Sequence, residues 1–253
     1  MAVTAEFDEQ ERARLLKQYS EIATLAGGLA HEIRNPLSTI RLNLNLLSEE
    51  VEQGESARDR RMLNKLLTLQ RECKHLEDIL DAFLQFARVG ELRLHPADLN
   101  TVVKQFVSFA QAELSEHGIE LSPHLDPDLP MVQLDETLMH QVLMNLVRNA
   151  RQAMPDGGLL EIQTYERDGR VCLDIIDNGI GMDERTRSRM FKAFFSTRSG
   201  GSGLGLPTVR KIIEAHHGTI ECESEPGQGT RFSISLPNAL IIADSNQDDD
   251  SEE

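Results

Sequence analysis

The sequence has 253 residues, of which 40% are hydrophobic and 4% aromatic, and it carries a formal net charge of −16. This length allows two domains with packed cores, and because Trp is absent those cores should consist of Leu, Ile, Val and Met. A net acidic chain with no basic stripe argues against direct binding of nucleic acid. The three cysteines are far apart and form no CxxC pair, which argues against a disulfide framework or a zinc site and fits a reducing cytosol.

Neither terminus has the features of a membrane anchor or an export signal. The longest uninterrupted apolar run, residues 239–243, is far shorter than the roughly 20 residues of a membrane span. Residues 1–10 are polar and acidic, unlike a signal peptide. Six of the last ten residues are acidic, so we expect a disordered acidic tail over residues 239–253. These features predict a cytoplasmic protein.

A helical pattern runs through residues 8–53. Pro36 lies inside it, and because proline removes a backbone hydrogen bond it predicts a kink near residues 32–36. The pattern resumes in phase after Pro36, so the helix is expected to bend rather than to end. Residues 53–56, Gln-Gly-Glu-Ser, predict a turn. The apolar stripe that defines the helix has steps of three and four and consists of Ile22, Leu25, Leu29, Ile33, Leu37, Ile40, Leu44, Leu47 and Val51.

A second helical pattern with the same spacing follows the turn. Two long amphipathic helices joined by a short turn form an αα-hairpin. One hairpin cannot bury two stripes of this length, so pairing with a second copy in a four-helix bundle is the favoured interpretation. The alternative is a hairpin packed against its own C-terminal domain. The second stripe consists of Met62, Leu66, Leu69, Cys73, Leu76, Leu80, Phe83 and Ala87.

The helical period is lost over residues 88–98, which contain Gly90 and Pro96 and mark a domain boundary. Beyond it the pattern becomes mixed and predicts an α+β layer, one mixed sheet with helices on one face. The expected helices run from a cap at Asn100 or Thr101 to about His117, over Asp135–Ala153 and over 203–216, with a short helix before the last. The expected strands are 119–124, 131–134, 159–166, 171–177, 219–224 and 230–236.

The most unusual stretch of the first helix is residues 28–37, Gly-Leu-Ala-His-Glu-Ile-Arg-Asn-Pro-Leu. It places His31 beside Glu32 and an amide, Asn35, one turn later, a combination that helix formation does not require. A histidine on a helix is most often a surface or satisfied residue. A neutral imidazole is, however, abundant at pH 7, because the unperturbed pKa of histidine is about 6.5, and it can act as a nucleophile.

Two glycine clusters predict a nucleotide site. Residues 177–181, Asp-Asn-Gly-Ile-Gly, close a strand; the carboxylate can accept a hydrogen bond from an exocyclic amine, and the glycines allow backbone to approach a ligand closely. Residues 201–206, Gly-Ser-Gly-Leu-Gly-Leu, precede a helix whose first amides suit a phosphate. The spacing excludes both the Rossmann fingerprint and the P-loop. Each cluster alone is more often a plain turn.

The helix expected from Asp135 carries amides on one face. Asn145, Asn149 and Gln152 follow one another at steps of four and three. Such residues are more often solvated surface, but here they precede both glycine clusters, which favours a ligand-facing site. Amide oxygens are hard donors suited to Mg²⁺ carried by phosphates.

Together these motifs make the chain resemble the transmitter core of two-component sensor histidine kinases over roughly residues 20–237. Five segments are similar to the family's motifs in the family's order: 31–36 resembles the H-box, 145–150 the N-box, 177–181 the G1 box, 191–195 the F-box and 201–206 the G2 box. The resemblance implies a HisKA-type helical hairpin followed by an α/β sandwich of the Bergerat or GHKL type.

The resemblance also divides the chain. It implies an N-terminal helical extension (1–20), a dimerisation and histidine phosphotransfer domain (21–88), a linker (89–98), an ATP-binding catalytic domain (99–238) and the acidic tail. Only about 20 residues precede the dimerisation domain, too few for a sensor domain. Either the signal arrives from another protein or the chain is a fragment.

In the hairpin, the resemblance implies that His31 is the phosphoacceptor and that Glu32 orients its ring and takes its proton. Asn35 matches the position that places a water for hydrolysis of the partner's aspartyl phosphate. Arg34 is as consistent with a phosphate contact as with a solvated side chain.

In the ATP-binding domain, the resemblance implies that Asn149 and Asn145 hold Mg²⁺. Asp177 would bind the adenine amine, and Thr230 would lie beside the adenine. Arg198 stands where the family often has Lys, and it keeps the charge. The other nucleotide contacts implied are Gly179, Gly181, Gly201, Gly203, Gly205 and Leu206, the later ones holding the phosphates under a lid around residues 196–200.

The predicted function is that of an ATP-dependent protein-histidine kinase. A homodimer would phosphorylate His31 and pass the phosphoryl group to an aspartate of a response regulator, and it would also act as a phosphatase of that regulator. The short lid and the sequence of residues 31–37 resemble those of the nitrogen-regulator type of sensor kinase. Two alternatives stay open: a non-catalytic ATP-binding dimerisation scaffold, and a related serine kinase or gyrase/Hsp90-like ATPase.

Overall fold

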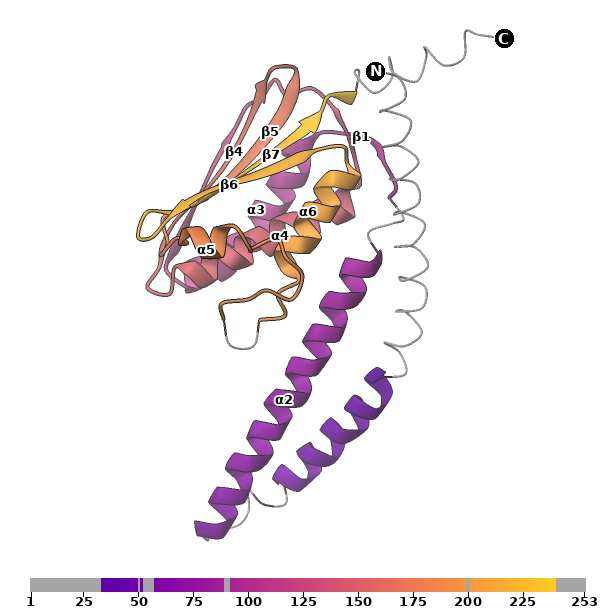
Figure 1. The fold of residues 1–253 in the computed structure, drawn as a ribbon, viewed down its shortest axis with the longest axis vertical. Coiled ribbons are helices and arrows are strands. Elements are labelled where there is room, and N and C mark those ends of the chain that lie inside the picture. The colour runs from indigo at the N-terminus through magenta and orange to yellow at the C-terminus, as the bar shows by residue number, and fades with distance from the viewer. Residues whose placement is uncertain (1–32, 50, 52–56, 89–91, 199–200, 240–253) are drawn as a thin grey trace, which may run out of the picture. The chain divides into compact units, whose positions relative to one another are not determined.

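The computed structural model describes residues 33–49, 51, 57–88, 92–198 and 201–239 (Figure 1). The chain divides into two compact units. The helical unit comprises the residues up to 91 together with 198–202, and the α/β unit comprises 92–197 and the residues from 203 onward. Among the described residues, no helix is both long and apolar enough to cross a membrane.

The helical unit is an antiparallel hairpin, as the two stripes predicted. Residues 33–49 are helical and α2 spans Ala57–Arg88. The Gln70 amide on α2 donates to Asn45 Oδ1 (3.0 Å) and to Ser48 Oγ (3.1 Å). Arg41 Nε on the first helix lies 3.5 Å from Glu77 Oε1 on α2. Earlier residues of one helix therefore lie beside later residues of the other.

Pro36 lies within the helix of residues 33–49. The greater part of the predicted kink, the predicted helix before residue 33, the predicted turn at 53–56 and the acidic tail beyond residue 239 lie outside the described residues.

Each apolar stripe of the hairpin splits into two sets with a seven-residue spacing. Leu37 and Leu44 on the first helix, like Leu66 and Cys73 on α2, are each 8% exposed. Leu44, Leu66 and Cys73 pack together in one cluster within the hairpin. The alternate positions of the same stripes face solvent, with exposed fractions of 39–50%. This exposed set consists of Ile33, Ile40, Leu47, Met62, Leu69 and Leu76, and we call it the open seam.

The α/β unit is a five-stranded sheet with α3, α4 and α6 on one face (Figure 1). The strand order is β2-β4-β5-β7-β6, with β2 parallel to β4 and the other pairs antiparallel. The predicted mixed sheet is confirmed. Its strands are β2 Ile119–Leu125, β4 Gly158–Arg167, β5 Arg170–Asp177, β6 Thr219–Glu225 and β7 Gly229–Pro237. The helices are α3 Leu99–Glu116, α4 Glu136–Ala153, α5 Glu184–Arg187 and α6 Gly205–Ala215.

The core of the α/β unit lies between the sheet and these helices. Strand β4 alternates, with Leu160, Ile162 and Thr164 buried, as expected for a strand with one face on a core. Phe106 on α3 and Leu143 on α4 are 0% exposed. Burying a side chain of this size contributes roughly 1.5–3 kcal/mol to the free energy of unfolding. The α/β unit therefore has a hydrophobic core of its own.

The predicted hairpin across residues 168–169 is confirmed. Strands β4 and β5 pair up to Arg167 and Arg170. Between them Asp168 and Gly169 have φ values of 53° and 72°, the left-handed conformation that a two-residue hairpin turn requires.

The predicted linker contains a strand that the sequence did not predict. Strand β1 (His95–Ala97) pairs antiparallel with β3 (Val132–Leu134) in a separate two-stranded sheet. Pro96 has no N–H to donate, which argues against a strand in the sequence but is tolerated in an edge strand. A three-residue strand with no period of its own is defined only by its partner.

Two predicted helix starts were wrong. The N-cap of α3 is Asp98, whose carboxylate accepts from the Asn100 N–H (2.8 Å) and the Thr101 hydroxyl (2.8 Å). Asn100 is instead buried, and its amide donates to Asp126 O (2.6 Å). Helix α6 begins at Gly205 rather than at residue 203, because Gly203 has a φ of 66°, which a right-handed helix cannot contain.

Candidate functional site

Asp177 and Thr230 face each other at one end of the sheet. They are register partners across β5 and β7, and both are 6% exposed. Asp177 Oδ1 accepts from the Gly179 N–H (2.9 Å), which fixes the carboxylate at the start of the glycine loop. The carboxylate and the hydroxyl therefore lie side by side at the strand ends, in an arrangement that can recognise a planar ligand by hydrogen bonds.

Ser224 on β6 supports this pair and was missed by the sequence reasoning. Its Oγ donates to Gly229 O (2.9 Å), lies 3.0 Å from Thr230 Oγ1 and accepts from the Met182 N–H (2.9 Å). Because the Ser224 proton goes to Gly229 O, the Thr230 hydroxyl donates to Ser224. The register of the last hairpin, which pairs Ser224 with Thr230, was the only signal that could have found it.

The glycines of residues 177–181 are required by close contacts within the protein. A Cβ on Gly181 would overlap Glu225 O, and one on Gly179 would lie 2.6 Å from Ala153 O. A Cβ on Gly229 would overlap Asp177 O. These contacts require glycine even without a ligand, and the close approach of this backbone to a ligand stays a prediction. They let the loop, the end of α4 and the last hairpin pack backbone to backbone around Asp177.

Asn145 faces the start of α6. A Cβ on Gly205 would lie 3.5 Å from Asn145 Oδ1, so the amide oxygen is next to the first turn of that helix. Asn149 follows one turn later on the same side of α4, away from the buried Leu146 and Ala150. One residue of the predicted amide face, Asn145, thus lies next to the start of α6, and Leu206 lies in the first turn of the same helix.

A backbone hydrogen bond joins the two ends of the segment between the F-box and α6. The Phe194 N–H donates to Gly203 O (3.0 Å), and a Cβ on Gly203 would lie 2.5 Å from Phe194 C. Phe194 itself has a φ of 62° and is 64% exposed, an uncommon conformation for a bulky residue. Within the segment, the Gly201 N–H donates to Arg198 O (3.3 Å). Residues 199–200 lie outside the described residues.

The histidine motif is only partly described. His31 and Glu32 lie outside the described residues. Asn35 is exposed on the helical unit, with its carbonyl accepting from the Thr39 hydroxyl (3.1 Å). Arg34 pairs with Asp81 on α2 and keeps a partly exposed side chain, so its contact with a phosphate stays a prediction.

Burial disfavours the thiolate form of two of the described cysteines. Burial raises the pKa of Cys222 to about 12, and burial also raises the pKa of Cys172. Both are therefore protonated at neutral pH and are poor nucleophiles. Among the described residues, no group of three or more His, Cys, Asp and Glu side chains could hold a metal ion.

Two family comparisons match successive parts of the chain. Residues 21–92 match the family described as His Kinase A (phospho-acceptor) domain. Residues 134–240 match the family described as histidine kinase-, DNA gyrase B-, and HSP90-like ATPase. The second match spans α4, both glycine clusters and the Asp177–Thr230 pair.

Whole-chain comparisons agree with both. The chain is 33% identical to the sensor histidine kinase ZraS of Klebsiella oxytoca over 229 residues, which is 90% of this chain and 48% of that protein. It is similar to full-length ShkA crystallised with AMPPNP, with a TM-score of 0.66 at 30% identity, over 84% of this chain and 45% of that one. In fold alone it is similar to the histidine kinase ThkA crystallised with the response regulator protein TrrA, with a TM-score of 0.63 at 24% identity, over 95% and 68% of the two chains.

The chain spans about half the length of ZraS and of ShkA. Over this span the phospho-acceptor domain and the ATPase domain stand in the same order as the five sequence motifs. The chain therefore belongs to the two-component sensor histidine kinases, and it carries their transmitter core.

Proposed function

We propose that this protein is an ATP-dependent protein-histidine kinase that phosphorylates His31. The observation that carries the proposal is the meeting of Asn145 with the first turn of α6, at one side of a domain whose strand ends hold the buried Asp177–Thr230 pair. An oxygen donor, a helix N-terminus and a hydrogen-bonding pair for a base suit ATP. The phospho-acceptor match over residues 21–92 includes His31.

The nucleotide would be held at three points. Asp177 would accept a hydrogen bond from the exocyclic amine of adenine, with Thr230 beside the ring. The first amides of α6 at Gly205 and Leu206, with Arg198, Gly201 and Gly203, would hold the phosphates, where backbone N–H groups and the helix dipole favour negative charge.

Asn149 and Asn145 would hold Mg²⁺ through their amide oxygens. Such hard oxygen donors, one of them beside Gly205 at the start of α6, fit an ion that binds together with the nucleotide. When bound, the ion would neutralise charge on the phosphates.

In the transfer step, a ring nitrogen of neutral His31 would attack the γ-phosphorus of ATP. The bond from that phosphorus to the bridging oxygen would break and ADP would leave. Glu32 would take the proton that the imidazole loses. The phosphoryl group would then move to an aspartate carboxylate of a response regulator, which would restore neutral His31.

The active form would be a homodimer. The open seam leaves one of the two heptad sets of each helix in solvent, and a second hairpin would cover both in a four-helix bundle. A response regulator is the expected second partner, since the similar fold of ThkA was crystallised with one. Exposed Asn35 would position water for dephosphorylation of that regulator.

The proposal is tested with γ-labelled ATP and Mg²⁺. We expect acid-labile, base-stable label on the wild-type protein and none on His31→Ala. His75→Ala, a histidine of α2 outside the motif, is the matched control and should label normally. Equal label on His31→Ala would refute the proposal. Acid-stable label would point to a serine kinase, and ATP binding without label would point to a scaffold.

A further inference from the structure

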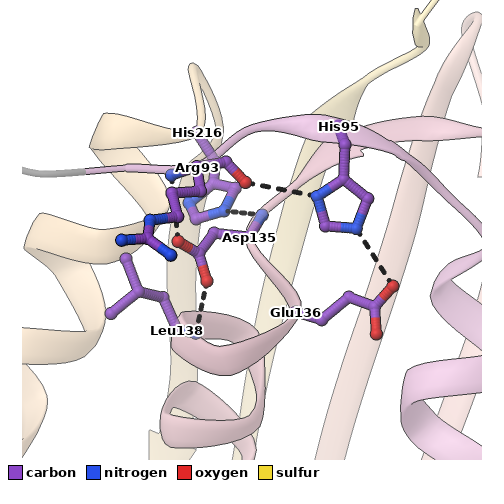
Figure 2. Close-up of polar contacts among 6 residues, drawn as sticks. All are labelled: Arg93, His95, Asp135, Glu136, Leu138 and His216. Atoms are coloured by element: carbon purple, nitrogen blue, oxygen red, sulfur yellow. Dashed lines mark hydrogen bonds and ion pairs between the residues drawn. The ribbon is translucent and has the colours of Figure 1, made fainter.

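The segment that follows α2 in sequence is bonded to the start of α4 (Figure 2). The Arg93 N–H donates to Asp135 Oδ2 (3.0 Å). His95 Nδ1 lies 3.2 Å from Arg93 O, and His95 Nε2 lies 3.2 Å from Glu136 Oε1. The pairing of β1 with β3 ends at His95 and Leu134, so strand pairing and side-chain bonds hold residues 93–97 against the same helix end.

Asp135 connects this segment to a second helix. Its Oδ1 caps α4 by accepting from the Leu138 N–H (3.1 Å), and its own N–H donates to His216 Nε2 (2.9 Å). Figure 2 shows the carboxylate of Asp135 between Arg93 and Leu138, with the His216 ring next to its backbone. One residue therefore joins the interdomain segment, the first turn of α4 and the residue that ends α6.

The His216 ring is held in one tautomer. It is 1% exposed, and its Nδ1 lies 2.8 Å from Ile212 O. Because Nε2 accepts from Asp135, the proton must be on Nδ1, which donates to Ile212 O. Burial lowers the pKa of His216, which keeps the ring neutral and able to accept at neutral pH.

The two helices joined by Asp135 are those of the proposed nucleotide site. Helix α4 carries Asn145 and Asn149, and α6 begins at Gly205 beside Asn145. With 11 residues, α6 is about 16 Å long, and a short helix moves as a rigid element. A ligand that fixes its first turn against α4 also fixes its far end, where His216 meets Asp135.

We infer that Asp135 is a positioning residue that couples occupancy of the nucleotide site to attachment of residues 92–97 on α4. The inference rests on the proposed function, because it takes the ligand of α4 and α6 to be a nucleotide. Coupling between two equilibria is reciprocal. Bound nucleotide strengthens the Arg93–Asp135 bond, and the bond strengthens nucleotide binding by the same factor.

The experiment measures hydrogen exchange of the Arg93 amide in the whole chain, with and without AMPPNP and Mg²⁺. Asp135→Asn keeps an oxygen for the cap, since Asn caps helices as well as Asp, but replaces the acceptor of Arg93 with an NH₂ group. In the wild type we expect nucleotide to slow Arg93 exchange about fivefold or more. In Asp135→Asn this protection should vanish, and the nucleotide Kd should rise by a similar factor.

The matched control is Asp98→Asn, the same change at the N-cap of α3, which should behave as the wild type does. If Asp135→Asn does not fold, Glu136→Gln removes only the exposed partner of His95 and should reduce the protection in part. A wild type that binds nucleotide with unchanged Arg93 exchange overturns the inference, as does full protection in both variants. A wild type that binds no nucleotide overturns the proposed function instead.

Discussion

The two units of this protein bury their apolar residues to different degrees. In the α/β unit, Leu99, Phe106 and Leu143 are 0% exposed, because a sheet and three helices enclose them. In the helical unit, Leu44 and Leu66 each retain 8% exposure and the open seam faces solvent. Two helices alone enclose only one of two heptad sets. The α/β unit is complete as a folding unit, whereas the hairpin needs another surface.

The difference extends to polar groups. In the α/β unit, buried Asn100 donates to Asp126 O and accepts from the Thr164 hydroxyl (2.8 Å), so its amide is satisfied within the core. In the hairpin, Arg34 pairs with Asp81 where both side chains remain about half exposed. Exposed pairs of this kind contribute about 0–1 kcal/mol. The proposed association of the hairpin would therefore depend mainly on the open seam.

The largest effect is expected from a charged substitution in the open seam. Ile40→Asp should dissociate the proposed dimer, because burying an Ile side chain is worth roughly 1.5–3 kcal/mol and each dimer contains two. We expect the dimer Kd to rise by at least about 100-fold, measured by sedimentation equilibrium. Glu49→Gln, at an exposed position of the same helix, should leave the mass unchanged. A dimeric Ile40→Asp protein would argue that the hairpin packs elsewhere.

A core substitution should act on the α/β unit alone. Phe106→Ala should lower its free energy of unfolding by about 3–5 kcal/mol, measured from denaturant transitions. Phe109→Ala on the same helix removes a ring that is 63% exposed and should change it by less than about 0.5 kcal/mol. Similar losses in the two variants would contradict the burial difference. The dimer Kd should be unaffected by either change.

The smallest effect expected is a pH dependence confined to the α/β unit. Burial lowers the pKa of His216 below its usual 6.5. As the pH falls through about 6.5, the unfolded chain takes up a proton that the folded chain refuses, so the free energy of unfolding decreases towards the lowered pKa. Above pH 6.5 the contribution is fully present. Denaturant midpoints at pH 7.5 and 5.5 measure it, and His216→Gln should flatten the slope.

His95 acts in the opposite direction. Its hydrogen bond to Glu136 raises its pKa, so its contribution is present below about pH 6.5 and is lost as the pH rises through the raised value. The side chain is exposed, so solvent screens the pair. His95→Gln should therefore leave the acid destabilisation in place or increase it slightly. A smaller acid destabilisation in this variant would contradict its assignment to His216.

The sequence by itself determined the hairpin, the mixed sheet and the family, because each rests on local information. Period-three-and-four stripes define helices, alternation and turn residues define strands, and five short motifs carry the family resemblance. It also placed Asn145, Asp177 and Thr230 in the candidate site, and the fold brings the last two together across β5 and β7.

Only the tertiary structure decided contacts between residues far apart in the chain. Strand β1 exists because β3 pairs with it, and the start of α6 depends on the left-handed Gly203 packed against Phe194. Ser224 and His216 have no local pattern that marks them. Their roles come from partners on other elements, Thr230 on β7 and Asp135 at the start of α4. Hydrogen bonds between distant segments leave no period in a sequence, and this is why the Asp135 network became visible only in the folded chain.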